Sequence, residues 1–214
     1  MEKIAIHTAY GFVARTLDEL SNTGEIDLGE NIDDIEKLVE ASIEEAAVRI
    51  HQSAPSYLME GKAGEMGSDY QAYITNSVLY LGMEAETVRV VRIKVGDSDQ
   101  VVTEFVPEDS PEGRMQLDSY ARGVPDDPVV VLQKKWEGDN KPAFKYYTTA
   151  LAKVEEGSVE LEYVPYPKVV VDEIEICPRL KYAVLNELAA MVMESLSLFD
   201  KATIYRTKAQ EAMK

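Results

Sequence analysis

Few side chains in this sequence are of the types that perform nucleophilic, acid–base or metal chemistry. The histidines are His7 and His51, and the cysteine is Cys177. The histidines are far apart in the sequence, and neither belongs to a pair with the spacing of metal ligands. Cys177 has no C-x-x-C partner, but it precedes Pro178 at an expected helix start, where a helix N-terminus can lower the pKa of a thiol. A reactive thiol and a small buried residue both fit this position, and we expect the buried residue.

Carboxylates are abundant, and adjacent pairs of them could be assigned the roles of acid and base. The pairs are Asp33–Asp34, Glu44–Glu45, Asp126–Asp127 and Glu155–Glu156. Adjacent carboxylates on a helix point in different directions, so we expect a solvated surface. The sequence contains no G-x-S-x-G, P-loop or G-x-G-x-x-G motif. We therefore expect no enzyme, no catalytic residue, no metal and no cofactor; an enzyme that uses carboxylates alone is the weaker alternative.

The charge is the most informative bulk property. The 214 residues include 39 Asp and Glu against 22 Lys and Arg, which gives a net charge of −17. Such a surface repels free nucleic acid. No apolar run approaches the ~18 residues of a membrane span, and the N-terminus lacks the apolar region of a secretory signal. With a single cysteine, these features predict a soluble protein of one or two domains, made in a cytoplasm.

Residues 1–60 are expected to be helical, with one short helix in 8–22 and a longer one from Asn31 to the residue before Pro55. The longer helix carries an apolar stripe with helical spacing that should face a core. This stripe consists of Ile35, Leu38, Val39, Ile43, Ala46, Ala47 and Ile50. The acidic residues Glu36, Glu40, Glu44 and Glu45 should lie on the exposed face.

Residues 61–176 are expected to form an antiparallel β-domain of about five strands. In residues 87–95 the apolar parity changes at Val90–Val91, which predicts a β-bulge or a strand buried on both faces. Segments 129–136, 143–151 and 159–164 indicate a three-stranded meander. Residues 107–128 hold four prolines and two glycines, and we expect this long loop to contact other molecules.

Residues 177–214 are expected to form a long C-terminal helix that completes the helical part. The first half has an apolar face wide enough for a core, whereas residues 200–214 have a thin, alanine-rich face. Residues 178–214 carry four acids and six bases, so this is the one net-positive part of the chain. We therefore expect 200–214 to leave the protomer and dock on a partner, or else to be a frayed end. The candidate contact residues are Lys201, Tyr205, Arg206 and Lys208. The predicted fold class is α+β, with the β-domain inserted between helical parts.

Three stretches give the chain a resemblance to the head–tail connector proteins of tailed bacteriophages. They are "AVRIHQSAPSYL", the middle segments "YARGVPDDPVVVL" and "ELEYVPYP", and "CPRLKYAVLNELAAMVMESLSLFDKATIYRTKAQEAM". These stretches are patterns of residue types that together span most of the chain. The size of the β-part makes the chain most similar to neck-ring adaptors that carry a β-domain.

This resemblance implies a virion structural protein of the neck that forms a homo-oligomeric, dodecameric ring. The ring would join the portal protein to the tail or to the next neck ring, without a membrane contact. DNA would pass through its centre, and an acidic lumen would prevent the phosphate backbone from binding to the wall. The competing hypothesis is an intracellular acidic accessory or inhibitor protein that acts by protein–protein binding.

Overall fold

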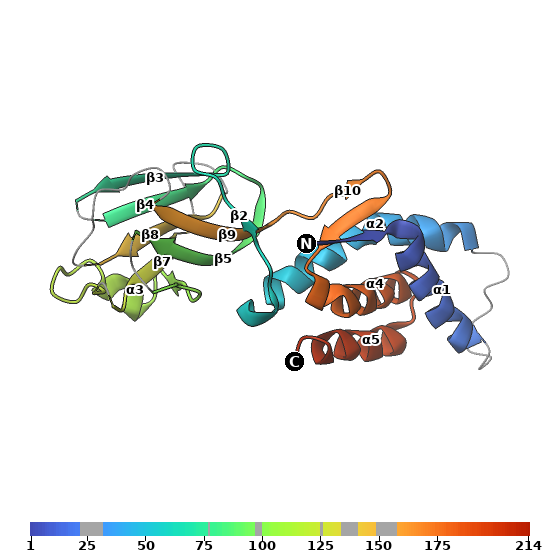
Figure 1. Cartoon of the computed structure of the whole chain (residues 1–214). Helices are drawn as coiled ribbons and strands as arrows, with labels where there is room; N and C mark the ends of the chain where they lie inside the picture. Colours follow the sequence, from blue (N-terminus) through green and yellow to red (C-terminus); the bar gives the residue numbers. More distant parts are fainter. Residues whose placement is uncertain (22–31, 77, 97–99, 125, 134–140, 149–157) are drawn as a thin grey trace. The chain divides into compact units, whose positions relative to one another are not determined.

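The computed structural model describes residues 1–21, 32–76, 78–96, 100–124, 126–133, 141–148 and 158–214. The expected α+β fold is confirmed, with a β-domain between N-terminal and C-terminal helical parts. The chain divides into two compact units, one formed by Met1–Glu60 and Tyr166–Lys214 and the other by Gly61–Pro165 (Figure 1). We call them the helical unit and the β-unit.

The second boundary differs from the expected one at residue 176. Strands β10 (Val169–Val170) and β11 (Glu173–Ile176) belong to the helical unit, because β11 pairs antiparallel with β1 (Glu2–Ala5). Residues 1–60 were expected to be helical only, so β1 was missed. This small sheet joins residues from the two ends of the chain (Figure 1).

The N-terminal helices of the helical unit are α1 (Ile6–Ser21) and α2 (Ile32–Ser53). The apolar stripe of α2 is buried as expected, except that Leu38 is half-buried. Glu36, Glu40 and Glu45 are exposed, whereas Glu44 is half-buried because its carboxylate accepts a hydrogen bond of 2.7 Å from the backbone N–H of Val169. Asn31, at which this helix was expected to begin, lies outside the described residues.

The C-terminal segment forms two helices after a short 3₁₀ turn, η2 (Pro178–Leu180). The helices α4 (Lys181–Ser195) and α5 (Phe199–Glu211) are separated at Ser197, whose φ of 63° ends the first helix. Helix α4 packs against α1, α2 and α5. It is apolar nearly all round, as expected for a central helix. Its buried residues are Ala183, Val184, Leu185, Glu187, Leu188, Ala189, Ala190, Met191, Val192 and Met193.

The β-unit contains two sheets, with strand orders β3-β4-β8-β7-β6 and β2-β9-β5 among the described residues. The strands of the first sheet are β3 (Tyr70–Thr75), β4 (Val78–Met83), β6 (Val106–Pro107), β7 (Val129–Gln133) and β8 (Ala143–Tyr147). Those of the second are β2 (Lys62–Ala63), β5 (Thr87–Val95) and β9 (Val159–Pro165). One apolar cluster draws side chains from both sheets, including Leu81, Phe144, Ile93 and Leu161, so the two sheets pack face to face.

The register confirms one local expectation and corrects another. Val90 pairs with Tyr163 and Arg92 with Glu162, so Val91 is the extra residue of a β-bulge. The expected meander is wrong in its last member: β7 and β8 pair, but β9 pairs with β5 and β2 in the other sheet. After β5, Val102 forms an isolated antiparallel bridge with Ile93.

Candidate functional site

His51 and Cys177, distant in the sequence, lie together in the helical unit. The Nε2 atom of His51 accepts a hydrogen bond of 3.1 Å from the backbone N–H of Cys177. Its Nδ1 atom donates to the carbonyl oxygen of Ala47 at 2.6 Å. This pair of bonds fits the neutral imidazole, and complete burial lowers the pKa of His51. Both ring nitrogens therefore stabilise the backbone, and neither is directed at a thiol or a substrate.

The Cys177 thiol is buried as well, and this burial raises its pKa. Its Sγ atom lies 3.4 Å from the carbonyl oxygen of Glu60 and 3.9 Å from Sδ of Met1. The side chain makes no capping hydrogen bond to η2. A protonated, enclosed thiol is a packing residue.

The paired carboxylates do not form a common site among the residues whose side chains are described. Glu44 bonds to the backbone of β10, whereas Glu45 accepts a hydrogen bond of 2.6 Å from Arg49. Asp126 and Asp127 are exposed. Asp33 and Asp34 lie in the first turn of α2, where their side chains are not described, and Glu155–Glu156 lie outside the described residues. In the described part of the chain, no group of three or more His, Cys, Asp or Glu is placed to hold a metal ion.

A charge cluster joins three helices of the helical unit. The buried Glu187 of α4 lies 3.4 Å from Nη1 of Arg49 and 3.5 Å from Nε of Arg206. Arg206 also donates two hydrogen bonds, of 2.6 and 2.7 Å, to the carboxylate of Glu194, and these bonds lower the pKa of that carboxyl group. Two guanidinium groups compensate the burial of Glu187, so the cluster links α2, α4 and α5.

The four residues expected to contact a partner lie on α5, which packs against α4, and their contact with a partner stays a prediction. Residues 200–211 do not leave the protomer, because α5 lies along α4 and buries Ala202, Tyr205 and Ala209. Tyr205 is buried and Arg206 is bound to Glu194 and Glu187. Lys208 is exposed but places Nζ 4.1 Å from the centre of the Tyr205 ring, and Lys201 is half-buried. The buried face of α5 is rich in alanine because small side chains allow α5 to pack closely against α4.

The long loop of residues 107–128 belongs to the β-unit. It contains the short helix α3 (Pro111–Met115), which Ser110 caps by accepting a hydrogen bond of 3.0 Å from Gly113 N–H. The loop exposes large apolar side chains that the sequence analysis did not select, namely Met115, Leu117, Tyr120 and Val124. The sequence signal that could have identified them is the occurrence of large apolar residues among prolines and acidic residues.

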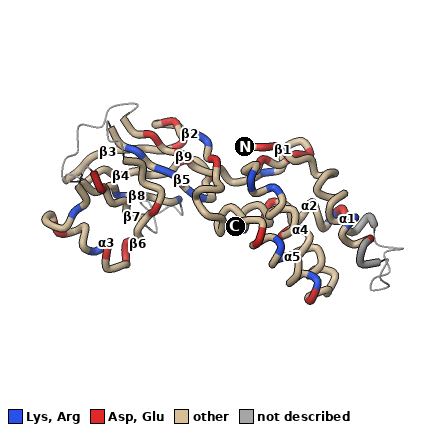
Figure 2. Tube along the Cα trace, turned by 60° about the horizontal axis from the view of Figure 1, so that its bottom comes forward, with Lys and Arg blue, Asp and Glu red and all other residues tan. Residues whose placement is uncertain are grey.

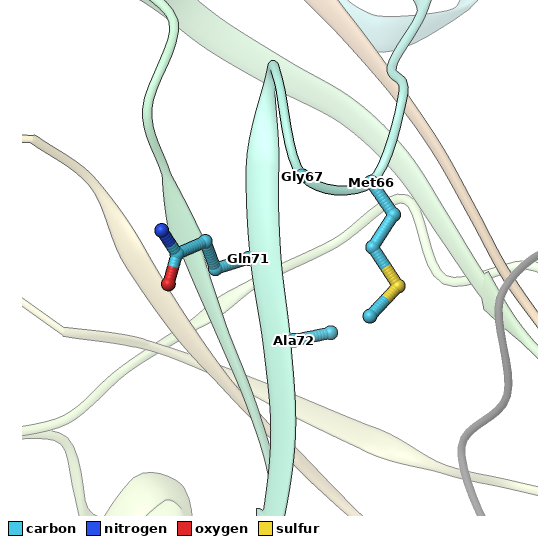
Figure 3. Close-up of a pocket in the computed structure, with 4 residues that line it drawn as sticks. All are labelled: Met66, Gly67, Gln71 and Ala72. Atoms are coloured by element: carbon cyan, nitrogen blue, oxygen red, sulfur yellow. The ribbon is translucent and has the colours of Figure 1, made fainter.

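A surface pocket of about 320 Å³ lies beside β3 (Figure 3). The described residues that line it are Met66, Gly67, Gln71 and Ala72. The Gln71 side chain and those of Met66 and Ala72 come from opposite sides of the strand in the close-up. None of the four is titratable, so they offer an apolar surface with one amide and no acid–base group.

No helix in the described part of the chain has the length and apolarity needed to cross a membrane. A scan against protein-family models and a search of curated proteins found no match.

Proposed function

We propose that this chain is a structural protein of the neck of a tailed bacteriophage, a head–tail connector that forms a ring between the portal protein and the tail or the next neck ring. The carrying observation is the strong excess of acids, with a net charge of −17. Acidic residues lie in both units (Figure 2). A protein ring around passing DNA must avoid the non-specific affinity that lysine and arginine give to phosphate.

The outer face of α2 supplies the carboxylates that this function needs. Glu36 and Glu40 are exposed one turn apart on a helix whose apolar stripe is fixed in the core. A rigid helix with outward acids keeps negative charge at the surface at little conformational cost. We assign this face to the channel wall of the ring.

The same charge would also suit the alternative function, an acidic accessory protein that covers the basic surface of another protein. The order of the chain favours the connector: the helical unit is built from both chain ends and the β-unit is inserted in it. This matches the connector-like stretches of the sequence, which fall in both units.

Co-expression with the portal protein of the same genome tests the proposal. The expected product is a portal assembly that carries an additional ring of this chain, visible by negative-stain electron microscopy and countable by native mass spectrometry. If neither the portal protein nor the neighbouring neck or tail protein purifies together with the chain, the connector function is rejected. A one-to-one complex with a nucleic-acid-binding protein would favour the accessory function.

A second arm tests the channel wall. Replacing Glu36 and Glu40 by Lys should leave the assembly intact, because both side chains are exposed. The variant ring should retain double-stranded DNA that the wild-type ring releases, and added salt should abolish the retention. Equal DNA release by both rings would remove α2 from the wall while leaving the connector function standing.

A further inference from the structure

The loop of residues 107–128 buries the polar side chain of Gln116 and exposes several large apolar side chains. Gln116 is buried, with 4% of its surface exposed, whereas Leu117 is 71% and Tyr120 is 99% exposed. Met115 and Val124 are exposed too. A loop that folded only for its own stability would turn its apolar groups inward, so a buried amide beside exposed apolar side chains is the informative arrangement.

The buried amide organises the loop. The Oε1 atom of Gln116 accepts a hydrogen bond of 2.9 Å from the backbone N–H of Gly123, and its backbone carbonyl accepts one of 3.2 Å from Nε of Arg122. The guanidinium group of Arg122 in turn lies 5.7 Å from the centre of the Tyr147 ring in β8. Gln116 therefore joins the two sides of the loop, and Arg122 fixes the loop to the sheet.

Close backbone contacts hold both ends of this segment. A Cβ atom on Gly123 would lie 2.7 Å from the backbone nitrogen of Val129 and 2.8 Å from the carbonyl oxygen of Tyr147. At the other end, the Ser110 hydroxyl donates a hydrogen bond of 2.7 Å to the carbonyl oxygen of Pro107. These contacts restrain the backbone that presents the exposed side chains, so binding through them costs little further entropy.

The exposed charges around these side chains are mostly negative. Within residues 112–127, four exposed acids stand against one exposed base, Arg114. The acids are Glu112, Asp118, Asp126 and Asp127. A second copy of a chain with net charge −17 is a poor electrostatic match for this surface. The complementary surface is an apolar pocket with lysine and arginine at its rim.

We propose that this loop apex, defined as Met115, Leu117, Tyr120 and Val124 with the four acids around them, inserts into such a pocket on a different protein of the neck. Tyr120 is the central anchor, because a tyrosine buries a large ring and keeps a polar tip. The acids accelerate association and select a basic rim. This inference rests on the proposed connector function and names the surface that would make its contact to the next protein.

Binding measurements with defined probes test the proposal. The probes are the purified portal protein and the purified next neck protein of the same genome, each titrated with the full chain. Wild type should bind one of them, and Leu117→Ser with Tyr120→Ser should weaken that binding by more than about tenfold. Tyr182→Ser is the matched control, since Tyr182 is an exposed tyrosine of α4 in the other unit. It should leave the affinity unchanged.

The charges are tested separately from the anchor. Asp126→Asn with Asp127→Asn should lower the association rate at low salt, and the difference from wild type should disappear at high salt. Thermal unfolding should be the same for all of these variants, because each altered side chain is exposed.

The outcomes separate this inference from the connector function. Equal binding by wild type and the Leu117/Tyr120 variant would overturn the role of the loop apex and leave the connector standing. Loss of self-association in that variant with unchanged probe binding would also overturn it, since the apex would then contact a second copy. If wild type binds neither probe, the connector function fails and the apex loses its partner with it.

Discussion

The imidazole of His51 accepts a hydrogen bond of 3.1 Å from the backbone N–H of Cys177, which ties the end of α2 to the start of the C-terminal helices. This bond requires an unprotonated Nε2, because Nδ1 already donates to Ala47. Protonation would turn the acceptor into a second donor facing an N–H group. The helical unit therefore contains a buried group whose charge state matters for its stability.

We expect the helical unit to lose stability as the pH falls below the ordinary histidine pKa of about 6.5. The pKa of His51 is lowered in the folded state, so in that range the unfolded chain binds a proton that the folded chain resists. Stability is fully present above pH ~6.5, falls as the pH decreases, and levels off below the folded pKa. Urea unfolding at several pH values between about 5.5 and 7.5 measures this effect.

His51→Gln should flatten this pH dependence, since an amide does not titrate. His7→Gln is the matched control, because His7 is exposed. An unchanged slope in His51→Gln would show that another group produces the effect.

The apolar stripe of α2 gives a second prediction. Ile43 is 1% exposed, so Ile43→Ala should lower the free energy of unfolding by about 2–5 kcal/mol. Glu40 is exposed on the same helix, and Glu40→Gln should change stability by less than about 0.5 kcal/mol. Chemical denaturation of the two variants checks the helix phase; similar effects at both positions would contradict it.

The turn between β10 and β11 gives a third prediction. Its two residues, Val171 and Asp172, have φ values of 49° and 60°, which a β-branched side chain tolerates poorly. Val171→Asn should therefore stabilise the helical unit by about 1 kcal/mol. The neighbouring Val170 lies in the strand, and Val170→Asn should give no such gain. A lower melting temperature for Val171→Asn would mean that the exposed valine contributes to stability in another way.

Local periodicity predicted the elements that have one clear buried face. The stripe of α2 and the bulge at Val90–Val91 follow from spacing alone, because the side-chain direction is set by the element's own geometry. Pairing between distant strands leaves no such mark. The partner of β1 is β11, more than 160 residues away, and β9 joins β5 rather than its neighbour β8.

The loop apex shows a different limit of sequence interpretation. The length and the prolines of the loop 107–128 predicted that this loop contacts other molecules, and that role stays a prediction. The burial of Gln116 was not visible, because glutamine is ordinarily a surface residue and the hydrogen bond from Gly123 to its side chain leaves no mark in the sequence. The expectation that residues 200–214 leave the protomer was wrong for a related reason. A thin alanine face predicts weak packing only if no close helix is available, and α4 supplies one for Ala202 and Ala209.

Helix α5 gives the last prediction, which reverses the expectation drawn from the sequence. Tyr205 is 8% exposed and lies on the buried face of α5, next to the Arg206–Glu194 contact. Tyr205→Ala should therefore lower the free energy of unfolding by about 3 kcal/mol. Ile204 is the matched control, since it is 48% exposed on the same helix, and Ile204→Ala should cost less than about 1 kcal/mol.

A chain that ends at Leu198 should melt at a clearly lower temperature, because the faces of α4 that α5 covers would meet water. If Tyr205→Ala and the shortened chain both melt like wild type, α5 is separable from the helical unit, and Lys201, Tyr205, Arg206 and Lys208 regain the docking role that the sequence suggested.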